Sequence, residues 1–167
     1  MEIRKYRDPV LVRVAEPVTE FDEALARLVD EMFASMYGAH GVGLAAPQVG
    51  VSRRLFVMDC STPEQRAAKI VMANPEVLET DGLQSGPEGC LSVPGIYSDL
   101  SRPARVRARG QTLAGEWFEI DVEGLEARCV MHETDHLDGK LYIDRLGPLK
   151  RDMVRRRIKK LQRLGEW

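Results

Sequence analysis

Apolar residues recur at helical spacing from Thr19 to Gly38, which predicts an amphipathic helix over this segment. Thr19 followed by Asp22 resembles a capping box with Asp in place of Glu, and Gly38 suits the stop after the last turn. Two further helices are predicted, from Leu125 to Gly139 and from Pro148 to Leu164, with Pro148 in the first turn.

Short runs rich in β-branched and aromatic residues predict strands at Arg54–Cys60, Lys69–Ala73, Ala104–Arg109 and Trp117–Val122. The segment from Gly82 to Pro103 is dense in Gly, Pro and Ser, so we expect an irregular loop around one short strand. Because the strands are grouped between helices rather than alternating with them, the pattern favours an α+β fold.

Length and composition indicate a globular chain. Its 167 residues suit a single domain spanning 1–167, with 44% hydrophobic and 30% charged residues and a net charge of −2. No apolar run is long enough to span a membrane, and the first residues have no secretory pattern. With only three cysteines, an odd number, we expect a reduced, cytoplasmic protein.

The sharpest chemical signal is His132-Glu133-Thr134-Asp135-His136. Residues i and i+4 share one face of a helix, so both imidazoles can bind one metal ion, and Glu133 can act on a water beside it. The alternative is a surface helix with two solvated histidines. Leu125, Cys129 and His132 fall on one helical stripe, which places the histidines toward the core.

A catalytic metal site of this type needs a third protein ligand. The extended zinc-protease pattern that begins H-E-x-x-H matches as far as Gly139, but Tyr142 stands where its last histidine would be. A glutamate about 20 residues after the second histidine is also missing, because Arg155–Arg157 occupy that region. Both observations argue against a metalloprotease.

Cys90 is the better candidate for the third ligand. It lies in Glu88-Gly89-Cys90-Leu91-Ser92, where Gly89 lets the backbone approach a ligand closely. Cys60 and Cys129 lie in apolar runs and fit buried structural cysteines. Cys129 could also approach the metal, but that choice would leave the segment around Cys90 unexplained.

A glycine-rich loop runs from Gly41 to Gly50. It formally fits a dinucleotide fingerprint, but that motif needs a strand before it and a helix after it. Here a helix precedes the loop and Pro47 follows the motif at once, which argues against nucleotide binding. The loop can instead bring backbone N–H groups and the Gln48 amide close to a substrate carbonyl, or it can be a plain turn.

Three segments, Gly41-Val42-Gly43-Leu44-Ala45-Ala46-Pro47-Gln48, Glu88-Gly89-Cys90-Leu91-Ser92 and His132-Glu133-Thr134-Asp135-His136, stand in order along the chain. Together they closely resemble the peptide deformylase family, over nearly the whole sequence. The resemblance implies small antiparallel and mixed β-sheets around a central metal-binding helix, with an N-terminal and a C-terminal helix. It implies removal of the formyl group from N-formylmethionyl peptides of nascent proteins, with release of formate.

The resemblance also implies roles for individual residues. The metal ligands are Cys90, His132 and His136, with water in the fourth position; Glu133 is the general base and acid; Gln48 and the Leu91 N–H hold the developing oxyanion. Substrate-binding positions are Val42, Gly43, Gly89, Arg102 and Arg128, where Arg102 helps to bind the substrate backbone. Two residues depart from the family pattern: Met131 replaces a usual Gln, and Arg128 occupies an often apolar position of the methionine pocket.

One divalent ion per chain is expected. The resemblance implies Fe²⁺ as the working ion, and an open site with one cysteine and two histidines also accepts Zn²⁺, Ni²⁺ or Co²⁺. A catalytically inactive metal-stabilised binding module is the alternative from another class, but the presence of Glu133 argues against it.

Basic residues are concentrated near the C-terminus. Between positions 150 and 163 there are eight basic side chains and one acidic one, whereas the whole chain is slightly acidic. This helix can present a solvated charged face, or it can bind RNA phosphates. The family resemblance favours contact with the ribosome through residues 150–163. We expect a monomer without membrane contact.

Overall fold

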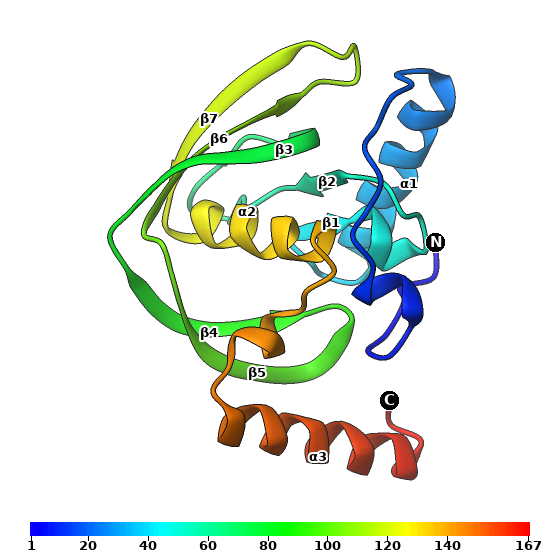
Figure 1. Cartoon of the computed structure of the whole chain (residues 1–167), viewed down its shortest axis with the longest axis vertical. Helices are drawn as coiled ribbons and strands as arrows, with labels where there is room; N and C mark the ends of the chain where they lie inside the picture. Colours follow the sequence, from blue (N-terminus) through cyan, green and yellow to red (C-terminus); the bar gives the residue numbers. More distant parts are fainter.

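The computed structural model describes residues 1–167. Two antiparallel sheets enclose a central helix (Figure 1). The larger sheet has the strand order β1-β2-β3-β6-β7, with bounds Gly43–Ala45, Leu55–Met58, Ile70–Asp81, Arg105–Gln111 and Trp117–Glu123. The smaller sheet is a hairpin of β4 (Gln84–Cys90) and β5 (Val93–Arg102). The α+β prediction is confirmed, although the only parallel pairing is an isolated bridge between Glu16 and Arg53.

The three predicted helices are present, with some different starts and ends. Helix α1 spans Glu23–Gly38, and its N-cap is Asp22, whose carboxylate accepts from Leu25 N, so Thr19 lies outside the helix. Helix α2 spans Gly124–Leu137 and α3 spans Pro148–Leu164, with Pro148 in the first turn as predicted. Short 3-10 helices η1, η2 and η3 cover Pro9–Val12, Ala46–Val49 and Tyr142–Arg145.

The β4–β5 hairpin corrects the prediction of an irregular loop from Gly82 to Pro103. Its strands pair from Gln84 and Arg102 to Cys90 and Val93, with a register shift after Gly89. A two-stranded sheet leaves one edge of each strand free, so Pro87, which lacks an N–H, is tolerated within β4.

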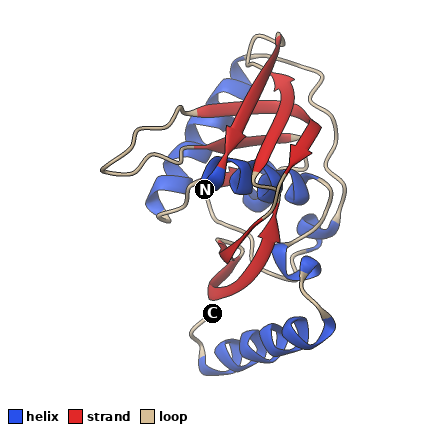
Figure 2. Ribbon diagram, turned by 90° about the vertical axis from the view of Figure 1, so that its left-hand side faces the viewer, coloured by secondary structure: helices blue, strands red, loops and turns tan.

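Helix α2 lies between the large sheet and the hairpin (Figure 1). Apolar residues of α2, β2, β3 and β6 form one part of the core, and α1 packs with β1 and β2 in another. At the far end of the molecule, α3 packs Val154 and Ile158 against the hairpin and η3 (Figure 2). The two sheets therefore bring the end of β4 to the buried face of α2. No helix of the chain has the length and apolar character needed to cross a membrane.

Candidate metal centre and active site

Helix α2 buries the paired histidines. His132 and His136 are 8% and 1% exposed, which confirms that they face the core. Their Nε2 atoms lie 3.2 Å apart, and the Sγ of Cys90, at the end of β4, lies 3.3 Å from His136 Nε2. The three ligand atoms all lie within 4.8 Å of one another. Two nitrogens bound to one tetrahedral ion are separated by about 3.3 Å, so this group fits a metal ion.

Glu88 fixes the orientation of His132. Its Oε2 lies 2.9 Å from His132 Nδ1, so we assign the ring proton to Nδ1 and a lone pair to Nε2. That lone pair faces His136 and Cys90, a convergence of donor atoms that a cation satisfies. His136 Nδ1, in contrast, is buried without a hydrogen-bond partner.

Arg102 anchors Glu88 instead of reaching into the active-site cavity. Its guanidinium is 3% exposed and donates to both carboxylate oxygens of Glu88, at 3.1 and 2.6 Å, and to Asp135 at 2.8 Å. Burial acts to raise the pKa of Glu88, but hydrogen bonds from His132 and Arg102 prevail and lower it to about 2. This position corrects the predicted contact of Arg102 with the substrate backbone, because the guanidinium does not line the cavity.

Glu133 lies beside the ligand cluster, is 3% exposed, and its Oε2 has no partner. Burial raises the pKa of Glu133 to about 7. Gly43 of β1 makes room for this carboxylate, since a Cβ at Gly43 would collide with Glu133 Oε1 and approach Cys129 Sγ to 2.6 Å. A buried carboxylate with a free oxygen in this position can accept and return a proton.

The Gln48 amide is aimed at the cluster by η2. Its Oε1 accepts from Ala45 N at 2.9 Å, which turns Nε2 toward Cys90 Sγ at 3.5 Å and Ser92 Oγ at 3.2 Å. The glycine loop and the cysteine segment meet closely here, because a Cβ on Gly41 would lie 2.7 Å from Leu91 Cδ1. The loop therefore places the Gln48 amide beside the ligand cluster.

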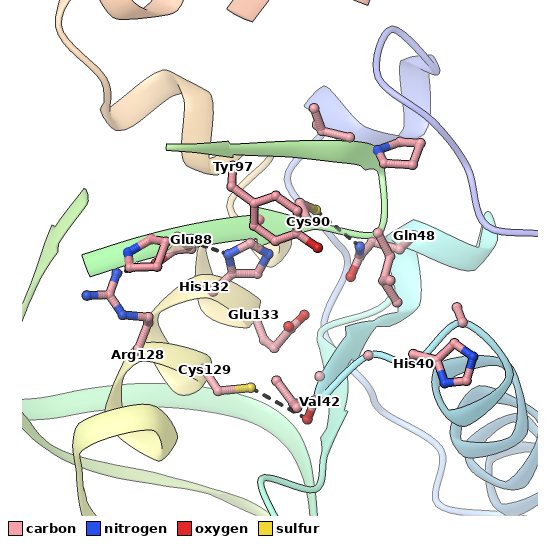
Figure 3. A pocket seen from close by; sticks show the side chains of 18 of the residues that line it. His40, Val42, Gln48, Glu88, Cys90, Tyr97, Arg128, Cys129, His132 and Glu133 are labelled. Atoms are coloured by element: carbon pink, nitrogen blue, oxygen red, sulfur yellow. Dashed lines mark hydrogen bonds and ion pairs between the residues drawn. The ribbon is translucent and has the colours of Figure 1, made fainter. Parts of the chain in front are cut away.

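These groups surround a cavity of about 380 Å³ (Figure 3). It is lined by nine of the predicted residues: Val42, Gly43, Gln48, Gly89, Cys90, Leu91, Arg128, His132 and Glu133. His136 and Arg102 lie behind this surface. Met131 packs against the core rather than into the cavity, and Cys60 and Cys129 are buried as predicted.

Leu125 and Tyr97 are among the lining residues that the sequence analysis did not assign to the site. Leu125 is 47% exposed at the cavity, so its expected place on the buried stripe of the helix is wrong. Tyr97 of β5 stands opposite Gly89, and its ring occupies the space that a side chain at Gly89 would need. Only the hairpin pairing brings Tyr97 to the site, and that pairing has no clear signal in the sequence.

One half-buried thiol and two buried imidazoles converge on one point, with a glutamate next to the first histidine and an amide aimed at the same place. This arrangement defines a hydrolase of the H-E-x-x-H metal-binding class. Comparison with known proteins narrows this class. A family profile described as "Polypeptide deformylase" matches residues 1–152. A peptide deformylase from Acidobacterium capsulatum is 56% identical over 165 residues, covering 99% of this chain and 97% of that protein.

Solved structures agree with this result. The crystal structure of a peptide deformylase from Legionella pneumophila superposes with a TM-score of 0.90 at 47% identity, covering 98% of this chain and 95% of that one. Peptide deformylase 1B of Arabidopsis thaliana, solved with an inhibitor, gives a TM-score of 0.90 at 39% identity, covering 99% and 92%. The chain belongs to the polypeptide deformylase family of metal-dependent hydrolases.

Proposed function

We propose that this chain hydrolyses the formamide of N-formylmethionyl peptides, releasing formate and a free N-terminal amine, with one divalent ion held by Cys90, His132 and His136. The observation that carries the proposal is the convergence of these three ligand atoms beside the free carboxylate oxygen of Glu133 and the Gln48 amide. The names of the relatives support the same activity.

A bound ion would supply a Lewis acid that polarises the formyl carbonyl and lowers the pKa of water. Glu133 takes a proton from the attacking water on its carboxylate, and then delivers it to the nitrogen of the leaving amine. Gln48 Nε2 and the Leu91 N–H donate to the developing oxyanion, where each donor contributes about 3 kcal/mol. Val42, Gly43 and Gly89 line the cavity closely enough to orient the peptide.

We propose Fe²⁺ as the ion in the cell, with Zn²⁺, Ni²⁺ and Co²⁺ as substitutes. The mixed sulfur and nitrogen donor set suits all four ions. Elemental analysis of protein purified without oxygen tests this assignment, and formate release should follow metal occupancy. A chain that remains fully active after complete removal of its metal contradicts the metal-dependent reaction.

We also propose that the basic face of α3 contacts the ribosome, where formylated nascent chains emerge. Arg155, Arg156 and Lys159 are exposed, while Val154 and Ile158 fix the opposite face of the helix to the protein. Only Asp152 offsets this charge within the helix, by pairing with Arg156. Such a face suits RNA phosphates.

We further propose that residues 1–167 form one domain acting as a cytoplasmic monomer. The large sheet, α2 and the hairpin each contribute to the same cavity, so none of them carries a complete site alone.

The direct test of the activity is a mass balance on a short formyl-Met peptide. Formate and free amine should appear in equal amounts, and a chelator should stop both. Release of internal peptide fragments without formate would support a metalloprotease instead.

A further inference from the structure

Arg128 presents unused hydrogen-bond donors at the wall of the cavity. It lies on α2 beside Cys129 and His132, and its side chain is 10% exposed (Figure 3). Only Nη1 forms hydrogen bonds, to Glu88 Oε1 at 3.0 Å and to Leu100 O at 3.1 Å. A guanidinium has five N–H donors, so those on Nε and Nη2 are without a partner.

The strand opposite leaves Nη2 uncovered. Gly86 lies two residues before Glu88 on β4 and therefore on the same face of the strand. A Cβ placed on Gly86 would meet only one atom within 4 Å, which is Arg128 Nη2 at 3.8 Å. Because Gly86 has no side chain, Arg128 Nη2 remains accessible on this side. A larger residue at position 86 would cover it.

The position of Arg128 suits the end of a substrate side chain. Arg128 precedes His132 by one helical turn, which is about 5.4 Å along the axis. Because His132, Arg128 and Leu125 line the same cavity, a substrate whose formyl group lies at the ligand cluster has room to place an unbranched side chain of methionine's length beside this turn of α2. Leu125, one turn further, closes the same wall with apolar surface.

The donors of Arg128 distinguish side chains of equal length by the atom at their end. A thioether is a weak acceptor, a hydrocarbon accepts no hydrogen bond, and a sulfoxide oxygen is a polar acceptor. We propose that Arg128 makes this pocket select for an acceptor atom, so that peptides beginning with formylmethionine sulfoxide are substrates and are preferred over formylnorleucine peptides. This inference rests on the proposed deformylase activity.

The experiment measures formate release from three otherwise identical peptides that begin with formylmethionine, its sulfoxide (each epimer separately) or formylnorleucine. For the parent protein we expect kcat/KM for the better sulfoxide epimer to exceed that for norleucine by about 10- to 100-fold, the range of one charge-assisted hydrogen bond. Arg128→Leu should bring this ratio to about one or below.

Arg128→Leu also removes a partner of Glu88 and could therefore misfold. A second variant tests the same donors without removing that partner. Gly86→Val covers Nη2 while leaving the bonds of Nη1 in place, and it should reduce the same ratio at least about tenfold. Gly38→Val is the matched control, because a Cβ there meets nothing within 4 Å, and its ratio should equal that of the parent.

A parent ratio of one or below, with formylmethionine still deformylated, would overturn the role of Arg128 and leave the proposed function intact. The same holds if Gly86→Val folds and keeps the parent ratio. Absence of formate from all three peptides, in protein holding one metal ion per chain, would refute the proposed function itself.

Discussion

Glu88 and His132 are joined by a buried contact of 2.9 Å between a carboxylate oxygen and Nδ1. This contact sets which ring nitrogen of His132 is free to face Cys90 and His136. Glu88 is itself held by Arg102 and Arg128, so the geometry of the ligand cluster depends on charges from β4, β5 and α2.

Replacing Arg102 should reduce stability. Arg102→Leu removes the cation that joins the buried carboxylates of Glu88 and Asp135, which keep only Arg128 and Arg145 as partners. Loss of one partner of a buried ion pair costs up to about 3–5 kcal/mol. Denaturant unfolding measures this loss. Arg107→Leu is the control, since its exposed pairs should contribute at most about 1 kcal/mol. Unchanged stability with a greatly raised KM would instead support direct contact of Arg102 with substrate.

Adding one methyl group at Gly43 should impair catalysis. The Cβ in Gly43→Ala would displace the carboxylate of Glu133 or the thiol of Cys129. A displacement of about 1 Å at a reacting group reduces the rate about 100-fold, so we expect a fall in kcat of about 10- to 100-fold. Gly38→Ala should keep the parent kcat, because its Cβ meets open space. Equal kcat values in the two variants would mean that Glu133 does not depend on this glycine.

Iron-loaded protein should lose activity in air faster than nickel-loaded protein. An Fe²⁺–thiolate centre exposed to oxygen promotes oxidation of its cysteine. Cys90 and Cys129 both line the cavity, but Cys90 is half-buried, whereas Cys129 and Cys60 are only 4% and 6% exposed, so oxygen adducts found by mass spectrometry should lie on Cys90. Equal lifetimes of the two forms would argue against an oxidisable iron site.

Reversing charges on α3 should weaken ribosome binding. Replacing Arg155, Arg156 and Lys159 by Glu retains the apolar contacts of the helix, and co-sedimentation at low salt should fall at least about tenfold. Replacing the exposed Arg13, Arg27 and Arg66 by Glu changes the net charge equally without touching α3. If both triple variants bind like the parent, the proposed contact is wrong.

The sequence predicted the three helices and the shared face of His132 and His136 because these features depend on local spacing. Two histidines four residues apart on a helix share a face in almost any fold, and the helix of His132 also carries Glu133. The relative positions of these three side chains depend only on the formation of α2.

Features that depend on pairing between distant segments were not predicted. The β4–β5 hairpin forms in spite of its Gly, Pro and Ser content because its strands pair with each other, and this pairing brings Tyr97 to the cavity. The pairing of Arg102 with Asp135 likewise joins β5 to α2. Leu125 is exposed because the cavity opens over that part of the helix.

The most direct test of this account compares formate release by the parent and by Glu133→Ala, both prepared without oxygen and both shown to hold one metal ion per chain. We predict formate from the parent, and a loss of at least about 100-fold in kcat for the variant at unchanged metal content, since Glu133 moves the proton. Equal rates from the two proteins would contradict the assignment of Glu133, and no formate from the metal-loaded parent would contradict deformylation.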